Sequence, residues 1–203
     1  MSYRGYDVLP VTHNMRETIA ESFGRRGQLV GSPVGQRSFE DEAAVPFPVR
    51  SFLWSCPDRA AVDVLRAFLD ARKGRLVPFW APTCCWDLRL VADAAPGLVL
   101  NIARAGYGDL VFWGSAARQD VAIFPRGGAM LTRRVLSVSA LDAATEQLSL
   151  ESTTGVQLVA GATVISFLVL CRLAEDLTEI RWLSPNACEA SIQFTELPRE
   201  VPA

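Results

Sequence analysis

Five cysteines are the residues of this chain best suited to chemistry, and their spacing limits what that chemistry could be. Thiolates bind zinc or iron–sulfur clusters when they occur in pairs such as C-x-x-C. Here Cys84 and Cys85 are adjacent, Cys56 precedes them, and Cys171 and Cys188 lie late in the chain, so no such pair is present. The odd number also argues against a disulfide framework. We therefore expect packed, reduced thiols and no metal, with Cys56, Cys84 and Cys85 as weak metal candidates.

The single histidine, His13, limits nucleophilic catalysis, because a nucleophile needs a neighbouring base. His13 lies in an irregular stretch, and nothing around Cys84 or Cys85 resembles a catalytic signature. Acidic residues cluster at 40–42 and 175–179, as is typical of solvated faces and turn ends rather than of a paired-carboxylate active site. We therefore expect no enzyme activity, no catalytic residue and no cofactor.

Composition favours a folded protein with one core-bearing domain. Of the 203 residues, 50% are hydrophobic and 21% are charged, which does not suit a disordered chain. The formal net charge of -2 disfavours electrostatic capture of nucleic acid or of an anionic membrane. The longest candidate for a membrane span, Val164–Leu170, is shorter than the ~18 residues required, and no basic-then-apolar leader opens the sequence. We expect no membrane partner and no sequence-specific nucleic-acid partner.

One helix is predicted over residues 57–73. Ser55 or Asp58 can cap its first turn, and Gly74 follows two basic residues as a C-terminal stop. Apolar residues recur at helical spacing and form a single stripe to be buried: Val62, Leu65, Phe68 and Leu69. The helix therefore needs one surface to pack against.

Most of the remaining sequence predicts short strands. They are expected at 36–42, 49–55, 87–93, 98–103, 109–113, 119–124, 129–140, 147–152, 164–173, 178–183 and 188–196. Turn residues such as Arg126–Gly128 and Ser184–Asn186 separate them. Strands at intervals of roughly ten residues predict a mainly β fold, namely an antiparallel β-sandwich or split barrel with one docked α-helix.

Residues 1–47 are rich in glycine, proline and charge and show no sustained periodicity. We expect an extended N-terminal arm with short strands over 1–47, followed by one β-sandwich or barrel domain over 48–203. Eight large apolar side chains are the candidates for the core or for an assembly interface: Trp54, Leu65, Phe68, Leu69, Phe79, Trp80, Trp86 and Trp182. Trp113 is a further aromatic of this kind.

The run Phe68–Trp80, FLDARKGRLVPFW, followed by Asp87–Leu88, resembles a pattern in distal tail and minor tail proteins of long-tailed bacteriophages and phage-like particles. In that family the pattern joins a helix to the strand that begins with Asp-Leu. Gly35–Arg37 is similar to the early part of such proteins, and Arg172–Trp182 with Ala190–Glu196 is similar to their closing strand pair.

The resemblance implies a structural virion protein of the tail tip or baseplate, assembled in the host cytoplasm. It implies a homo-oligomeric ring that joins the tail tube to the hub or receptor-binding apparatus. Its partners would be further copies of itself, the tail tube protein, the tail hub and other tail-tip proteins. An open-edged sandwich can continue its sheet into a neighbour, and the arm over 1–47 can lie across adjacent subunits.

Other functions remain open from the residues alone. One is a tail hub subunit with an iron–sulfur cluster bound by cysteines, for which Cys56, Cys84 and Cys85 are the candidates. Another is a tail-associated cell-wall hydrolase, which would have to pair His13 with Cys84 or Cys85. A capsid decoration protein or a head-to-tail connector is a further structural alternative.

Overall fold

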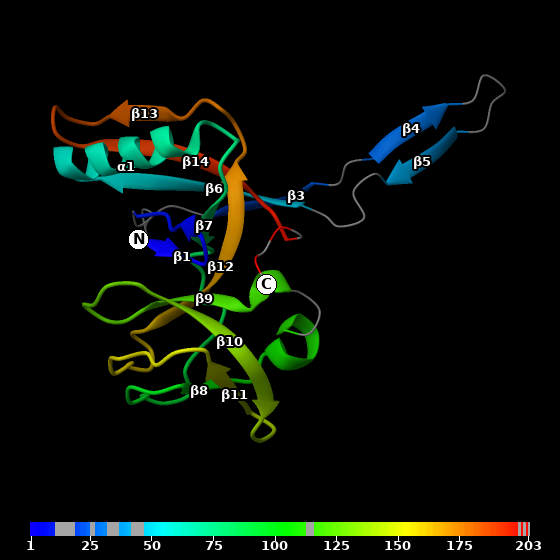
Figure 1. The fold of residues 1–203 in the computed structure, drawn as a ribbon, viewed down its shortest axis with the longest axis vertical. Coiled ribbons are helices and arrows are strands. Elements are labelled where there is room, and N and C mark those ends of the chain that lie inside the picture. The colour runs from blue at the N-terminus through cyan, green and yellow to red at the C-terminus, as the bar shows by residue number, and fades with distance from the viewer. Residues whose placement is uncertain are drawn as a thin grey trace. The chain divides into compact units, whose positions relative to one another are not determined.

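The structure is a computed structural model of the chain. It describes residues 1–10, 19–24, 27–31, 37–41, 47–112, 116–198, 200 and 202, with the backbone alone described at 27–31, 37–41, 47 and 110. Within these residues the protein is mainly β, with a large antiparallel sheet and one α-helix (Figure 1). This agrees with the expected β-sandwich, and the sheet is not a closed barrel. No helix in the described part is long and apolar enough to cross a membrane.

The secondary-structure elements follow one another in this order along the chain: β1 (Ser2–Tyr3), β2 (Tyr6–Asp7), β3 (Ala20–Gly24), β4 (Gly27–Gly31), β5 (Arg37–Asp41), β6 (Phe47–Cys56), α1 (Arg59–Arg72), β7 (Phe79–Pro82), β8 (Val99–Ala103), η1 (Tyr107–Phe112), η2 (Ala116–Arg118), β9 (Asp120–Phe124), β10 (Leu131–Ala140), β11 (Thr145–Leu150), β12 (Val164–Leu173), β13 (Glu179–Trp182) and β14 (Cys188–Glu196). The short η1 is a π-helical turn and η2 a 3₁₀ turn.

The chain divides into two compact units. Unit 1 comprises Met1–Leu9, Phe79–Leu170 and Pro198–Ala203, and unit 2 comprises Pro10–Pro78 and Cys171–Leu197. The boundary near residue 170 falls inside β12, so this strand contributes residues to both units.

Unit 2 contains an antiparallel sheet in the order β3-β6-β14, and β14 pairs on its other side with β13 and with the end of β12. The longest ladder joins β6 and β14 over eight residue pairs, from Cys188 opposite Cys56 to Thr195 opposite Val49. Alternate residues of both strands are buried, because successive side chains of a strand point to opposite faces. The rings of Phe52 and Phe194 stack on this buried face, with centroids 4.9 Å apart.

Helix α1 lies alongside β6 and β14 (Figure 1) and supplies the apolar stripe that the sequence predicts. It begins after Asp58, whose carboxylate accepts a hydrogen bond from the Ala61 N–H at 2.8 Å. It ends at Arg72, and Lys73 follows as a C-terminal cap in the left-handed conformation. Val62, Leu65 and Phe68 are buried, so the predicted helix is confirmed, with ends one or two residues inside 57–73.

Strands β4 and β5 form a two-stranded antiparallel hairpin, from Gly27 opposite Asp41 to Gly31 opposite Arg37. Within the described residues, neither strand pairs with a third. The expected strand at 36–42 is therefore confirmed as β5, whereas its partner β4 was not predicted.

Unit 1 contains the strand order β12-β9-β10-β11-β8, with β7 on the other side of β12. Its main core is a cluster of buried apolar side chains from strands β8 to β12, from η1 and from the segments that connect β7 to β8 and β11 to β12: Leu88, Leu90, Leu100, Ile102, Tyr107, Phe112, Val121, Ile123, Val135, Leu148, Leu150, Leu158 and Ile165. A second cluster surrounds Trp80 and includes Val8, Ala122, Leu168 and Leu170.

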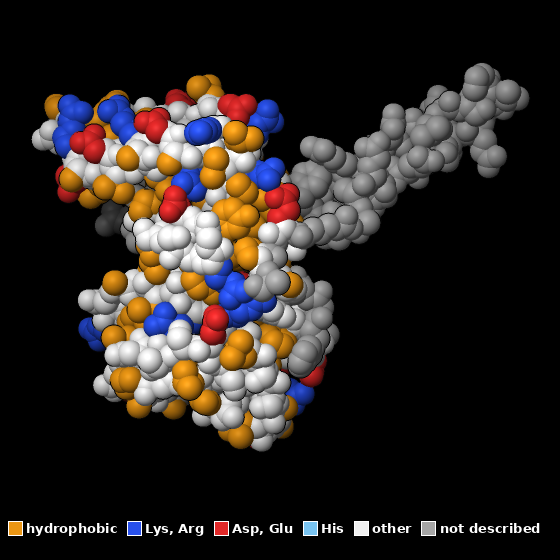
Figure 2. Space-filling model, viewed as in Figure 1, with side chains coloured by type: hydrophobic (Ala, Val, Ile, Leu, Met, Phe, Trp, Pro, Cys, Tyr) orange, Lys and Arg blue, Asp and Glu red, His pale blue; other side chains and the backbone are white. Residues whose placement is uncertain are grey.

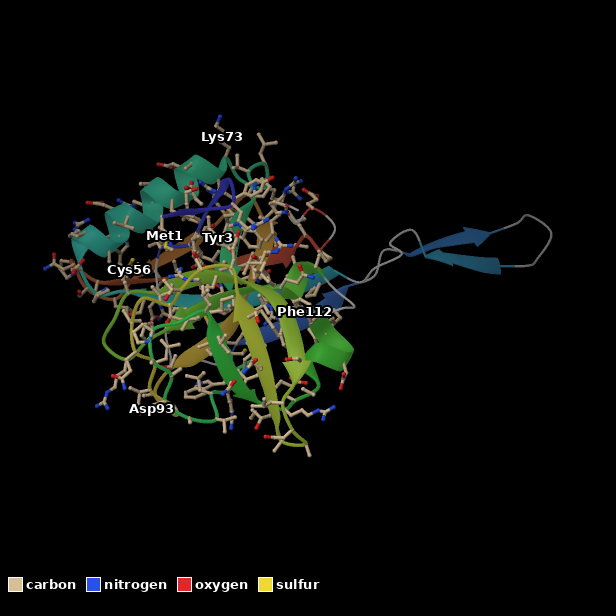
Figure 3. The ribbon with its side chains drawn as sticks, turned by 60° about the horizontal axis from the view of Figure 1, so that its bottom comes forward. Met1, Tyr3, Cys56, Lys73, Asp93 and Phe112 are labelled. Carbon is tan, nitrogen blue, oxygen red and sulfur yellow. The ribbon has the colours of Figure 1, made fainter. Side chains whose placement is uncertain are left out.

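The N-terminal segment packs into this second cluster through Tyr3, Tyr6 and Val8. Leu9 N–H donates to the Trp80 carbonyl at 2.9 Å, and the indole N–H of Trp80 donates to the Tyr3 carbonyl at 2.9 Å. The rings of Tyr3 and Trp80 meet edge to face, and Val8 is 1% exposed. Met1 and Tyr3, labelled in Figure 3, therefore begin a packed segment of unit 1.

Of the arm expected over 1–47, Met1–Leu9 belongs to unit 1 and contains the short strands β1 and β2. Residues 11–18, 25–26, 32–36 and 42–46 lie outside the described residues, so the expected boundary at residue 47 stays a prediction. The single domain expected over 48–203 contributes residues to both compact units.

The predictions of two strands are wrong. The segment 87–93 forms isolated bridges, Leu88 with Ile165 of β12 and Leu90 with Ile102 of β8, because it crosses between two strands instead of extending one ladder. The segment 109–113 falls largely within η1, since a short apolar run fits a buried helical turn as well as a strand.

Candidate functional site

The three candidate metal ligands do not come together in one described site. Cys56 lies in unit 2, buried opposite Cys188, whereas Cys84 and Cys85 follow β7 in unit 1 and are partly exposed. Cys84 adopts a positive φ of 58°, and its thiol donates to the Pro82 carbonyl at 3.6 Å. Among the described residues, no group of three or more His, Cys, Asp or Glu side chains is placed to hold a metal ion. The expected absence of a bound metal stays a prediction.

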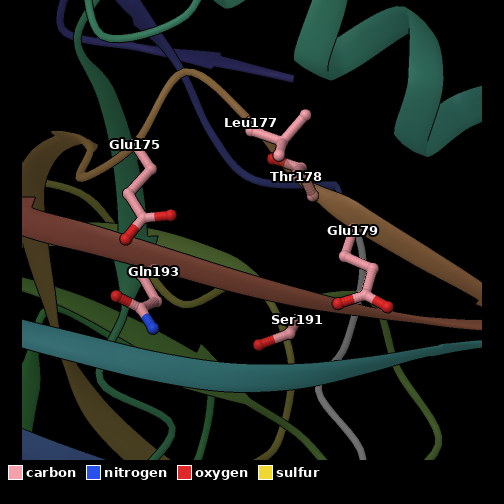
Figure 4. A pocket seen from close by; sticks show the side chains of 6 residues that line it. All are labelled: Glu175, Leu177, Thr178, Glu179, Ser191 and Gln193. Carbon is pink, nitrogen blue, oxygen red and sulfur yellow. The ribbon is translucent and has the colours of Figure 1, made fainter.

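His13 and the side chains of 40–42 lie outside the described residues. The other acidic cluster borders a cavity of about 210 Å³ in unit 2 (Figure 4), lined by Glu175, Leu177, Thr178, Glu179, Ser191 and Gln193. Most of these side chains are exposed, and they offer carboxylates, hydroxyls and an amide. The lining can form hydrogen bonds, but it contains no thiol or imidazole that could act as a nucleophile with its base.

A buried ion pair joins the two long strands of unit 2. Arg50 of β6 donates through Nε to Glu196 Oε1 at 2.8 Å and through a terminal nitrogen to Glu21 Oε1 at 2.7 Å. The side chains of Arg50 and Glu196 are 7% and 2% exposed. Burial raises the pKa of the nearby Cys171 thiol, and the Glu196 carboxylate raises it further. This cluster holds β3, β6 and β14 together and is not open to a substrate.

A second buried polar group lies in unit 1. The Tyr3 hydroxyl donates to Asp120 Oδ1 at 2.6 Å, and an Arg134 nitrogen lies 3.9 Å from Asp120 Oδ2. Burial raises the pKa of Asp120, while the Tyr3 hydrogen bond and the Arg134 charge partly offset this rise. Because Asp120 is fully buried, the contact attaches the N-terminal segment to β9 and does not expose an acid to solvent.

The residues that give the family resemblance form a structural contact, which we call the Arg75–Asp176 clamp. The backbone N–H and the guanidinium of Arg75 both donate to Asp176 Oδ1, at 3.0 and 3.3 Å. These bonds lower the pKa of Asp176 below its ordinary value. Gly74 between helix and clamp has a φ of +65°, and a Cβ there would collide with the Asp176 carboxylate. Arg72 donates to the Pro78 carbonyl at 3.1 Å. The motif thus fixes the path of the chain where it leaves the C-terminal end of α1.

We predict that Gly74→Ala lowers the free energy of unfolding by about 2 kcal/mol, because a left-handed alanine is strained and its Cβ displaces Asp176. The matched control is Gly127→Ala, since Gly127 has a φ of +69° with no atom within 4 Å of an added Cβ. The control should cost about 1 kcal/mol. Urea unfolding followed by circular dichroism measures both. In an Asp176→Ala background the two costs should become equal, and an unchanged difference would contradict the clash.

The eight candidate core or assembly residues fall into two groups. Five are buried, with exposed fractions of 8% or less: Trp54, Leu65, Phe68, Phe79 and Trp80. Leu69 is half-buried, whereas Trp86 and Trp182 are 42% and 39% exposed. Trp113 lies outside the described residues. Of the eight candidates, Trp86 and Trp182 are therefore the two that are available for contact with another molecule.

Trp182 ends β13 and lies beneath two arginines of α1. The guanidinium carbons of Arg59 and Arg66 lie 4.8 and 5.8 Å from its ring centroid. Exposed Leu177 and Leu183 flank this strand. Figure 2 shows basic, acidic and hydrophobic side chains interspersed over α1 and β13, a mixed surface that suits a protein partner better than a polyanion.

Two strands of unit 2 have an open side. Within the described part of the chain, β3 pairs only with β6 and β13 only with β14. Nearly all side chains of β3 are exposed, and Phe23 is 71% exposed. Strand edges of this kind can pair with another chain.

No protein-family model matches this chain, and no curated protein matches its sequence significantly.

Proposed function

We propose that this protein is a structural subunit of a phage tail tip, which forms a ring joining the tail tube to the hub or receptor-binding apparatus. Its partners are further copies of itself, the tail tube protein, the tail hub and other tail-tip proteins. It is assembled in the host cytoplasm and retained in the virion. The resemblance at Phe68–Trp80 suggests this role, and the hairpin formed by β4 and β5 supports it.

The hairpin is the structural feature that most supports this proposal, because two strands alone make few stabilising contacts. Its two strands pair only with each other within the described residues. A two-stranded hairpin is marginally stable in water unless a third strand or another surface packs against it. A neighbouring subunit can supply that surface, which favours an assembling protein over an isolated one.

The edge strands β3 and β13 indicate how copies of the protein would contact one another in the ring. Because β3 and β13 are at different places in the sheet of unit 2, a contact between them would join different surfaces of two copies. Such a head-to-tail contact closes into a ring when the rotation between copies divides a full turn. A ring made in this way needs no cofactor and no catalytic group.

The first test is the mass of the purified protein by light scattering, with electron microscopy of any large species. We predict a ring with a central hole. Replacing residues 28–40 by a short Gly-Ser linker should abolish the ring and change the melting temperature by less than about 3 °C, because the hairpin adds little to the stability of the sheet.

The control for this variant is Leu136→Ser, which changes an exposed apolar side chain of unit 1 and should leave the ring intact. A protein that stays monomeric at high concentration, alone and with the tail tube protein, would contradict the proposal. A linker variant that still forms rings would remove the hairpin from the interface but would leave the ring itself supported.

A further inference from the structure

Two cysteines lie directly opposite each other where β6 ends and β14 begins. Cys56 and Cys188 are Cα partners in the ladder, and both are reduced in the structure. They are 0% and 1% exposed. Cys56, labelled in Figure 3, is followed by Pro57 and by Asp58, the cap of α1. The pair therefore lies where the sheet of unit 2 passes into its helix.

The ladder places the two thiols on one face of the sheet. Directly opposite residues of an antiparallel pair point to the same side, and their Cα atoms are about 4.5–5.5 Å apart. A disulfide requires a Cα separation of about 4.4–6.8 Å. Trp182 is the Cα partner of Cys188 on β13 and lies beneath Arg59 and Arg66 of α1, so this is the face that α1 covers.

The two sulfurs also interact in the reduced state. Burial raises the pKa of Cys56 to about 11, and the neighbouring Cys188 thiol and the Asp58 carboxylate add to the rise. The thiolate is the reactive form, so exchange at the folded site should be slow at neutral pH. A bond between them would form more readily during folding, while the thiols are still exposed to solvent.

We infer that Cys56 and Cys188 form an intramolecular disulfide when the protein folds in the presence of a low-molecular-weight disulfide such as oxidised glutathione. In the first step, one cysteine thiolate attacks a glutathione sulfur and releases one glutathione thiolate. In the second, the other cysteine thiolate attacks the protein-bound sulfur and releases the second glutathione. The two cysteine sulfurs are oxidised, two glutathiones are reduced, and two protons are released from the protein thiols.

This modification goes beyond the proposed function and does not depend on it. It would join the end of β6 to the start of β14, closing a loop of roughly 130 residues that contains α1 and all of β7 to β13. A cross-link over so long a loop restricts the unfolded chain strongly. A protein folded under reducing conditions would lack it, and one folded under oxidising conditions would gain stability in unit 2.

The other cysteines provide internal controls. Cys171 lies opposite Glu196, so no thiol faces it across the ladder. Cys84 and Cys85 are adjacent and fall in one tryptic peptide, 76–89, whereas Cys56 falls in 51–59 and Cys188 in 182–199. Cross-links that join different pairs of peptides therefore differ in mass.

The experiment refolds the full chain from guanidinium chloride at pH 8.5 in mixed oxidised and reduced glutathione. Remaining thiols are alkylated, and tryptic peptides are identified by mass spectrometry. We expect peptide 51–59 cross-linked to 182–199 as the main disulfide, with Cys171 alkylated. The melting temperature should rise by roughly 5–10 °C, the rise should be reversed by dithiothreitol, and it should be absent in Cys188→Ser.

Two results would overturn the inference. One is alkylation of both Cys56 and Cys188 after refolding, with any disulfide confined to peptide 76–89. The other is a cross-link between 51–59 and 182–199 that lowers the melting temperature, which would mean that the bond distorts the native ladder. Cys171→Ser, which removes a buried thiol without a cysteine opposite it, should leave the cross-link and its stabilising effect in place.

Discussion

Replacing Trp80 by alanine is expected to lower the free energy of unfolding of unit 1 by about 3–5 kcal/mol. The side chain is 0% exposed and is the centre of the cluster that includes Val8 and Leu170. Its loss leaves a cavity and also leaves the Tyr3 carbonyl without the indole N–H that donates to it at 2.9 Å. Guanidinium unfolding followed by far-ultraviolet circular dichroism measures the change without depending on tryptophan fluorescence.

The matched control is Trp86→Ala, which removes the same side chain from a site that is 42% exposed. Trp86 has the Arg89 guanidinium carbon 5.8 Å from its ring, an exposed contact worth about 0.5–1 kcal/mol. The loss in this variant should therefore be at most about 1 kcal/mol. Equal losses in the two variants would show that Trp80 is not a core residue of a stably packed unit.

Two of the long strands could be predicted from the sequence with accurate ends. Strands β12 and β14 begin and end at the predicted residues, Val164–Leu173 and Cys188–Glu196. In β14 every second side chain is buried, so the periodicity of the sequence reports the periodicity of the fold. Helix α1 could also be predicted from the sequence, because an Asp58 cap and an apolar stripe are local signals.

The N-terminal segment could not be predicted in this way, because its structure depends on distant residues. Tyr3 contacts Trp80 and Asp120, and no local periodicity in residues 1–9 indicates either partner. The composition of this region is typical of an irregular arm. Its packing follows from two aromatic rings and a buried carboxylate, which become neighbours only in the folded chain.

The sequence shows Gly74 within a motif, but it does not show the physical reason for a glycine at this position. Asp176 lies about a hundred residues later and explains why glycine is required there. The pairing of Cys56 with Cys188 is similar, since each is an ordinary member of an alternating strand until the register of β6 and β14 is known. Register is a property of two strands and cannot be derived from either alone.

One feature of the buried face could have been found from the sequence. Arg50 falls on the same face of β6 as Phe52 and Trp54, and Glu196 falls on the same face of β14 as Ile192 and Phe194. A charged residue among buried apolar residues needs an opposite charge, so each of these positions indicates a partner. The sequence does not identify that partner, because the two charges are on strands that lie far apart along the chain.

Glu196→Ala is accordingly expected to lower the free energy of unfolding of unit 2 by about 3 kcal/mol, since it removes the buried partner of Arg50 Nε. Glu21 still pairs with the other side of the guanidinium, which limits the loss. The matched control on the same strand is Glu189→Ala, which changes a half-buried side chain on the opposite face and should cost less than about 0.5 kcal/mol. Urea unfolding at pH 7 measures both.

A double variant separates the effect of charge from the effect of packing. Arg50→Met with Glu196→Leu removes both charges and keeps most of the buried volume, and such replacements of a buried ion pair are often neutral or stabilising. We therefore expect the double variant to be more stable than Glu196→Ala alone, because no unpaired charge remains in the core of unit 2. If the double variant is as unstable as Glu196→Ala, the hydrogen bonds between the strands contribute more than the cost of burying their charges. In that case the ion pair is a source of stability in unit 2 and not a cost that the fold tolerates.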